Sequence, residues 1–133
     1  MATATAFTNL GKAVFTNRIK GGGTEPAFIG IGTGATAISR TAAATDTALA
    51  TPSGSRIGPN GTNGVVSSQQ TTTTTNDTYR VVGTFTPGTA VTYDESGLFD
   101  ATTAGNLCLS STFPGVNLLV GDQIEITMQV VLP

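Results

Sequence analysis

The sequence predicts a mainly β protein: an antiparallel β-sandwich, jelly-roll or immunoglobulin-like in topology, with one N-terminal amphipathic helix. Between Thr78 and Leu132, apolar and polar residues alternate almost without a break. Successive side chains of a strand point to opposite faces, so this alternation is typical of strands with one buried face. Glycine and proline residues separate the alternating segments, as expected for short strands joined by turns in a two-sheet fold.

The N-terminal helix is predicted by apolar residues that recur at intervals of three to five positions. It is expected to run from Thr5, a suitable N-cap, to Lys20. The glycines at 21–23 end the helix and form a flexible hinge. We therefore divide the chain into an N-terminal arm, residues 1–23, and a β-sandwich domain, residues 24–133. With such a hinge, the helix can pack on its own domain or on a neighbouring subunit.

After the hinge, Pro26 opens a short apolar strand that extends to Ile31. Residues 33–76 are dominated by Ala, Thr, Ser, Gly and Asn, which predicts mostly loops with one or two strands. The run Thr71 to Thr75 is β-branched, and it predicts an exposed strand or hairpin arm.

The second half of the chain contains the best-defined strands. One strand ends at Phe85, and the turn Pro87-Gly88 leads to the next. Residues 102–106 turn the chain before a strand over 107–113, and residues 114–121 form the last connection before the final strand. The sequence predicts seven or eight strands in total.

Composition favours a binding or structural role for a single domain. The 133 residues can bury a core of their own. Charged residues make up 11% of the chain, against about 25% in ordinary soluble domains, and a polar but nearly uncharged surface packs readily against other protein. A nucleic-acid partner is not favoured, because the chain has only six basic residues and a net charge of -2.

No signal peptide and no membrane span are expected from the sequence, so we predict a soluble, unprocessed chain made in the cytoplasm. Cys108 has no second cysteine to pair with and lies in a predicted strand. It is therefore expected to be a small packing residue rather than a reactive thiol.

The run Gly30 to Ala35 matches the G-x-G-x-x-[GA] pattern of dinucleotide-binding loops. That pattern normally opens a helix and is followed by an acidic residue about 20 positions later, and the sequence provides neither. The other interpretation is that closely spaced glycines let a strand end turn sharply or touch a neighbouring backbone. We expect no cofactor.

A group of carboxylates is the other candidate for chemistry. Asp94, Glu95 and Asp100 lie close together with Ser96, and Asp122 can approach from the last strand. Paired carboxylates can bind calcium or carry out acid–base chemistry. Calcium-loop spacing is absent and strand alternation separates the carboxylates, so the alternative is that they are solvated or accept turn hydrogen bonds.

The usual catalytic base is missing, because the chain contains no histidine and neither of its lysines falls in a Ser-x-x-Lys pattern. We therefore expect neither an enzyme nor a metal site.

Basic residues are concentrated near the N-terminus: residues 1–20 contain three of them and no acid, whereas all eight acids lie in the rest of the chain. This distribution fits either charge complementarity within one fold or a basic arm that docks on an acidic partner or on the next subunit. The residues expected to bind a partner are Phe7, Leu10, Val14 and Phe15 as apolar anchors, with Lys12, Arg18 and Lys20 as charge guides.

The order of elements resembles that of small structural proteins of tailed bacteriophages. The residues that carry the resemblance follow the N-terminal helix: Phe28 to Gly34, Thr45 to Leu49, Phe85 to Gly88, Glu95 to Asp100, and the final strand after Gly121-Asp122. Such proteins are capsid cement or decoration proteins and tail or fibre-associated proteins. The resemblance implies a non-enzymatic assembly role, with a trimer as the expected oligomer, and it assigns no catalytic residue.

The expected function is that of a capsid cement protein, which bridges neighbouring subunits of the major capsid protein on the outer surface of the virion. A tail, neck or fibre component is the structural alternative, and a carbohydrate-binding or hydrolytic β-sandwich is the alternative from another class. Two features depart from the family pattern: Ala50 to Ser53, where an acidic residue is expected, and the long Thr-rich loop. Both bear on the attachment site.

Overall fold

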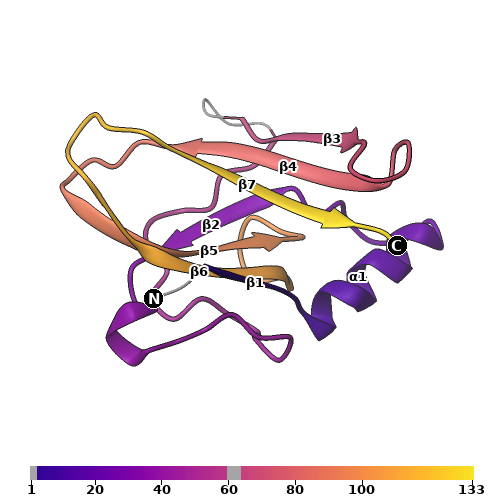
Figure 1. Ribbon diagram of the computed structural model, residues 1–133, viewed down its shortest axis with the longest axis horizontal. Coiled ribbons are helices and arrows are strands. Elements are labelled where there is room, and N and C mark those ends of the chain that lie inside the picture. Colours follow the sequence, from indigo (N-terminus) through magenta and orange to yellow (C-terminus); the bar gives the residue numbers. More distant parts are fainter. Residues whose placement is uncertain (1–2, 60–63) are drawn as a thin grey trace.

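The computed structural model describes residues 3–59 and 64–133, which form two antiparallel sheets and one short α-helix (Figure 1). The predicted mainly β fold is therefore confirmed. The strands are β1 (Ala4–Phe7), β2 (Phe28–Gly32), β3 (Val66–Gln70), β4 (Thr78–Phe85), β5 (Val91–Phe99), β6 (Leu107–Leu118) and β7 (Ile124–Val131). The helix α1 spans Asn9–Ile19, and a single 3-10 turn, η1, spans Thr36–Ile38.

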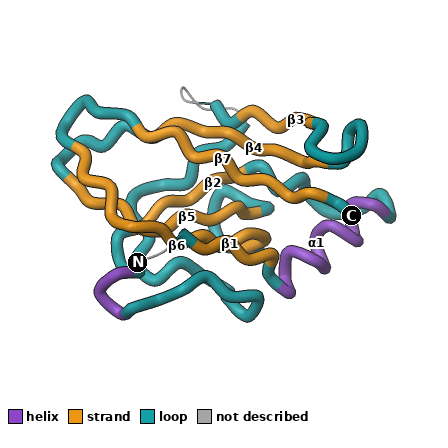
Figure 2. Tube along the Cα trace, in the orientation of Figure 1, coloured by secondary structure: helices purple, strands orange, loops and turns teal. Residues whose placement is uncertain are grey.

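One sheet has four strands in the order β1-β6-β5-β2, and the other has three in the order β3-β4-β7. The chain passes between the sheets through the long segment between β2 and β3 and through two short connections, β4–β5 and β6–β7 (Figure 2). Neighbouring strands within each sheet are antiparallel throughout.

The core lies between the two sheets. Ile29, Leu98 and Leu109 from the four-stranded sheet belong to the same buried cluster as Val81 and Met128 from the three-stranded sheet. The alternation read from the sequence produces this cluster, because one parity of β7 is buried and the other is exposed.

The helix starts later than predicted. Residues 4–7 pair with β6 as an edge strand, so Thr5 faces Ser111 and is not a helix cap. Thr8 is the N-cap instead: its hydroxyl accepts a hydrogen bond from the Gly11 N–H at 2.8 Å and donates to the carbonyl of Leu107. The apolar spacing predicted too early a start for the helix, because Phe7 fits the pattern of a helix face as well as that of a strand.

One predicted strand and one predicted connection are also wrong. Residues 71–75 are not a strand; they belong to the turn between β3 and β4, where the Asp77 carboxylate accepts hydrogen bonds from three backbone N–H groups, those of Thr72, Thr73 and Thr74. Residues 114–118 are part of β6 rather than of a loop. Pro114 is tolerated there because it lies where the β5–β6 register shifts, and a missing N–H breaks no regular pairing at such a point.

The N-terminal segment packs on the sheets: β1 pairs with β6, and α1 contacts β6. Gly11 allows the closest approach, since a methyl group at this position would overlap the carbonyl of Cys108. The expected division after residue 23 implies that residues 24–133 fold without the N-terminal segment. That independence stays a prediction.

Candidate functional site

An apolar groove of about 480 Å³ lies at the end of the molecule where α1 meets the C-terminus (Figure 1). Its apolar surface comes from Phe7, Phe15, Ile19, Pro26, Tyr79 and Leu132. Lys12, Arg18 and Glu25 are the charged residues that line it. The groove therefore combines residues from the N-terminal segment, the hinge region, β4 and the C-terminus.

Edge-to-face aromatic contacts join three residues of the groove lining. The rings of Phe7 and Phe15 meet edge to face with centroids 5.0 Å apart, and Phe15 meets Tyr79 in the same way at 5.8 Å. The Tyr79 hydroxyl donates to the Pro26 carbonyl at 2.9 Å and lies 3.0 Å from a carboxylate oxygen of Glu25. Burial, and then the charge of Glu25, raise the pKa of Tyr79, so its hydroxyl stays protonated and able to donate.

Two residues of the groove lining expose large apolar side chains. Ile19 is 83% exposed and Leu132 is 54% exposed. Exposed apolar side chains that border a groove, with charged residues at its rim, are typical of protein interaction sites.

Two cations, Lys12 and Arg18, lie at the rim, and both are exposed. Arg18 donates to the carbonyl of Gly23 at 2.8 Å, which holds its guanidinium near the hinge. Glu25, the acid among the described lining residues, shares the hydrogen bond from the Tyr79 hydroxyl with the Pro26 carbonyl. The groove therefore favours a partner that is apolar at its centre and acidic at its edge.

The structure places four of the seven predicted partner-binding residues in this groove: Phe7, Lys12, Phe15 and Arg18. The other three lie outside its lining. Leu10 is partly buried, Val14 is only 8% exposed, and Lys20 is exposed at the end of α1. Whether any of the seven binds a partner stays a prediction.

Sequence reasoning missed the groove residues that come from other elements. Tyr79 lies near the start of β4, and Leu132 follows the end of β7. These two strands are neighbours in the three-stranded sheet, and they come close to α1 only after folding. Ile19 was part of the predicted helix pattern, but nothing in that pattern indicates that it faces a groove rather than the core.

A second candidate is the group of carboxylates on β5, which the structure uses internally. Glu95 is completely buried, and its carboxylate accepts hydrogen bonds from Arg40 at 2.8 Å and from the N–H groups of Ala50 and Thr51 at 3.0 and 2.8 Å. The interpretation that the acids are solvated is therefore wrong for Glu95. Asp94 accepts the N–H groups of Ala35 and Thr36, at the start of η1.

Asp46 completes the buried ionic group, which we define as Arg40, Asp46 and Glu95. Its carboxylate lies 2.7 Å from Arg40 and accepts the hydroxyl of Ser110 at 2.6 Å. Burial alone would raise the pKa of Asp46, but the hydrogen bonds from Ser110 and Ala43, together with the charge of Arg40, lower it overall. The group fastens the segment between β2 and β3 to the outer face of the four-stranded sheet.

Turn hydrogen bonds, the other part of that interpretation, are confirmed for the two remaining acids. Asp100 accepts the N–H of Asn106 at 2.6 Å, and Asp122 accepts the N–H of Leu119 at 2.8 Å. In the part of the chain that the structure describes, no group of three or more Cys, Asp or Glu side chains is placed to hold a metal ion.

The glycine-rich run at residues 30–35 belongs to β2 and the loop after it. A methyl group at Gly32 would overlap the carboxylate of Glu95, and one at Gly34 would overlap the side chain of Thr51. These glycines thus allow close packing over the buried ionic group, in line with the structural interpretation of the pattern.

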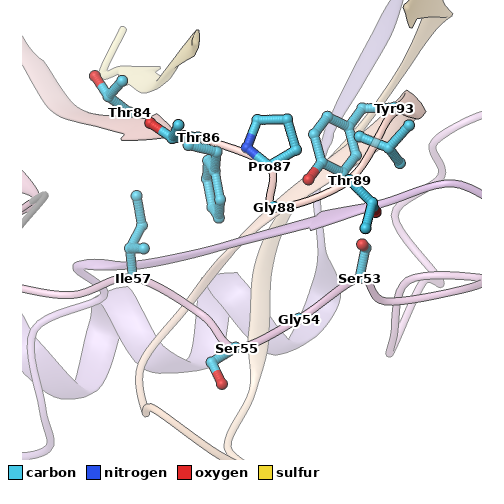
Figure 3. Close-up of a pocket in the computed structure, with 12 residues that line it drawn as sticks. Ser53, Gly54, Ser55, Ile57, Thr84, Thr86, Pro87, Gly88, Thr89 and Tyr93 are labelled. Atoms are coloured by element: carbon cyan, nitrogen blue, oxygen red, sulfur yellow. The ribbon is translucent and has the colours of Figure 1, made fainter. Parts of the chain in front are cut away.

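A separate cavity of about 320 Å³ lies between the β4–β5 turn and residues 53–57 (Figure 3). Among the residues that the structure describes, its lining is rich in hydroxyl groups and holds no charged side chain. The hydroxyls belong to Ser53, Ser55, Thr84, Thr86, Thr89 and Tyr93. Such a lining suits an uncharged polar ligand.

Cys108 is buried beneath α1, and burial raises the pKa of its thiol to about 12. A thiol of this kind stays protonated at neutral pH and is a poor nucleophile. No helix among the described residues is both long and apolar enough to cross a membrane.

Comparison of the chain with protein-family models, with curated proteins and with solved structures finds no match.

Proposed function

We propose that the protein is a non-enzymatic structural component of a bacteriophage virion, a capsid cement protein that bridges neighbouring subunits of the major capsid protein on the outer surface. The observation that carries the proposal is the apolar groove with its cationic rim, to which the basic N-terminal segment contributes exposed side chains. The resemblance in the order of sequence elements supports the same role.

We further propose that the two sheets form a β-sandwich of jelly-roll or immunoglobulin-like type and that the assembled form is a trimer. The shared core between the sheets supports the sandwich. The charge-poor, hydroxyl-rich surface supports close packing of copies.

Cement action follows from mass action. A protein that binds only the assembled shell stabilises it by an amount that grows with the logarithm of its free concentration relative to its dissociation constant. No covalent step is needed, and apolar contacts in the groove can supply the affinity while the cations increase the rate of encounter.

Particles assembled without the protein provide the test. They should lose their shell more readily on heating, and purified protein added afterwards should restore their resistance. The variant Ile19→Asp should bind such particles at least about tenfold more weakly, because it places a carboxylate in the apolar wall. Val66→Asp is the matched control, since Val66 is also largely exposed, at 64%, but lies on β3 outside the groove.

Equal binding by the two variants would contradict attachment through the groove. Imaging of the decorated particles separates the structural alternatives, because a tail, neck or fibre component would appear away from the shell.

Carbohydrate binding is a second candidate function, favoured by the uncharged, hydroxyl-lined cavity between the β4–β5 turn and residues 53–57. Sugars offer many hydroxyls for such a lining and carry no charge. Titration calorimetry with neutral mono- and oligosaccharides tests this candidate, with Tyr93→Phe as the variant. A complete lack of heat change across the panel of sugars would contradict carbohydrate binding.

A further inference from the structure

The connection between β6 and β7, residues 119–123, forms an apolar projection that we call the tip loop. It lies at the end of the molecule opposite α1 and the C-terminus (Figure 1). Leu119 and Val120 are each 68% exposed, and they are adjacent in sequence. Two neighbouring large apolar side chains exposed to solvent are unusual in a loop, because removing apolar surface from water is favourable.

The tip loop is shaped rather than extended. The Asp122 carboxylate accepts the N–H of Leu119 at 2.8 Å, and the Asp122 N–H donates to the Leu119 carbonyl at 3.1 Å. Gly121 takes a positive φ of 89°, which completes the turn. The projection therefore presents its apolar side chains on a closed turn that loses little freedom when it binds.

Charge on the tip loop complements charge on the groove. Asp122 is exposed beside the apolar pair, whereas Lys12 and Arg18 line the groove at the other end of the molecule. Glu25, the acid in the groove lining, already accepts the Tyr79 hydroxyl. One end of the chain thus offers an apolar, acidic projection, and the other end offers an apolar cavity with a mainly basic rim.

We propose that the tip loop of one copy of this chain inserts into the groove of a second copy, so that the copies associate head to tail. This inference names a second copy of the chain as the occupant of the groove and rests on the assembly role proposed above. A groove filled by a tip loop does not touch the shell itself, so under this inference Ile19→Asp weakens particle binding by separating the copies. A head-to-tail contact uses different surfaces on the two copies, so it closes into a ring, such as a trimer, or continues as an open chain. One loop in one groove buries less than the roughly 1,200 Å² of a stable interface, so each contact is weak alone and gains from repetition on a shell.

Complementation between two variants of the full chain tests the proposal. Leu119→Asp damages the tip loop and keeps the groove, whereas Ile19→Asp damages the groove and keeps the tip loop. Sedimentation velocity from about 1 µM to about 1 mM should show self-association of the wild type, weakened at least about tenfold in each variant alone. An equal mixture of the two variants should recover association but stop at dimers, because only one intact tip and one intact groove remain to meet.

The matched control is Val66→Asp, which should associate like the wild type, since Val66 is exposed on β3 away from both surfaces. Asp122→Asn keeps the acceptor for the Leu119 N–H and removes the charge, so it should weaken association mainly at low salt. A wild type that stays monomeric across the whole range overturns the proposal. So does a mixture of the two variants that recovers nothing, which would indicate a symmetric contact.

Cross-linking identifies the contact directly. Val120→Cys on one copy and Thr16→Cys, in the groove lining of another, should form a mixed disulfide in preference to either homodimer. Thr89→Cys replaces Val120→Cys as the control, because Thr89 is exposed on the neighbouring β4–β5 turn. A yield no higher than this control overturns the proposal.

These measurements need only the purified chain, so they are separate from particle binding. If head-to-tail association fails while Ile19→Asp still abolishes particle binding, the assembly role stands and this inference is wrong. If the chain associates head to tail but binds no particle, the contact stands and the cement role is wrong.

Discussion

Glu95 is the residue whose environment constrains the fold most strongly, because it is a completely buried carboxylate. Arg40, with only 11% of its side chain exposed, supplies the compensating charge at 2.8 Å. Breaking a buried ion pair by removing one partner is costly, since the remaining charge loses its compensation.

Arg40→Met is therefore expected to lower the free energy of unfolding by about 3 kcal/mol, measured by urea denaturation. Arg80→Met is the matched control, because Arg80 donates to the side chain of Gln129 at 3.3 Å near the surface. Its loss should change stability by at most about 0.5 kcal/mol. Equal effects of the two substitutions would show that the buried ionic group contributes little.

Asp46 makes the free energy of unfolding depend on pH in the acid range. Its folded-state pKa lies below the model-compound value of 3.8, so its contribution is fully present above the unfolded pKa and is lost as pH falls through the folded pKa. The stability difference between wild type and Asp46→Asn should be largest near neutral pH and shrink as pH falls below 3.8. Chemical denaturation across this range measures it, and a difference independent of pH would contradict the assignment.

The contact between α1 and β6 depends on Gly11. Alanine normally favours a helix over glycine by about 1 kcal/mol, but a methyl group here would overlap the carbonyl of Cys108. Gly11→Ala should therefore destabilise the protein by about 1 kcal/mol or more, because overpacking outweighs helix propensity.

Gly88→Ala is the control for this substitution, since a methyl group at Gly88 meets no atom within 4 Å. Its effect should stay within about 0.5 kcal/mol. Thermal unfolding of both variants gives the comparison, and a Gly11→Ala variant more stable than the wild type would show that α1 can move away from β6.

Removal of residues 1–23 tests the proposed division of the chain. Every buried member of the main core cluster lies between Ile29 and Val130, and Phe7 and Phe15 only pack against that cluster. The truncated chain should therefore keep a cooperative unfolding transition, at a lower midpoint because β6 loses its neighbour β1. Circular dichroism during heating measures this, and the absence of a transition would make the N-terminal segment part of the minimal fold.

The molecule as a whole places basic charge beside an apolar groove. Lys12 and Arg18 of the N-terminal segment line the groove together with one acid, Glu25. Exposed charges act mainly on the rate of encounter and are screened within about 8 Å at physiological salt, whereas desolvated apolar contacts set the rate of dissociation.

Raising the salt concentration should therefore slow association of the protein with particles and leave dissociation nearly unchanged. Surface plasmon resonance on immobilised particles separates the two rates. The variant Lys12→Gln should reproduce part of the salt effect at low ionic strength, and a dissociation rate that rises steeply with salt would show that ion pairs hold the complex.

The sequence by itself determined the mainly β class, the buried parity of β4 and β7, and the presence of one N-terminal helix, because these follow from local periodicity in side-chain polarity. Only the tertiary structure decided that residues 4–7 are a strand, since pairing with β6 supplies hydrogen bonds that no local pattern reveals. The same holds for Glu95: a carboxylate is stable inside the protein only when a distant arginine reaches it, and that meeting depends on how the segment between β2 and β3 covers the sheet. The groove, too, exists only because elements far apart in the chain meet around Tyr79.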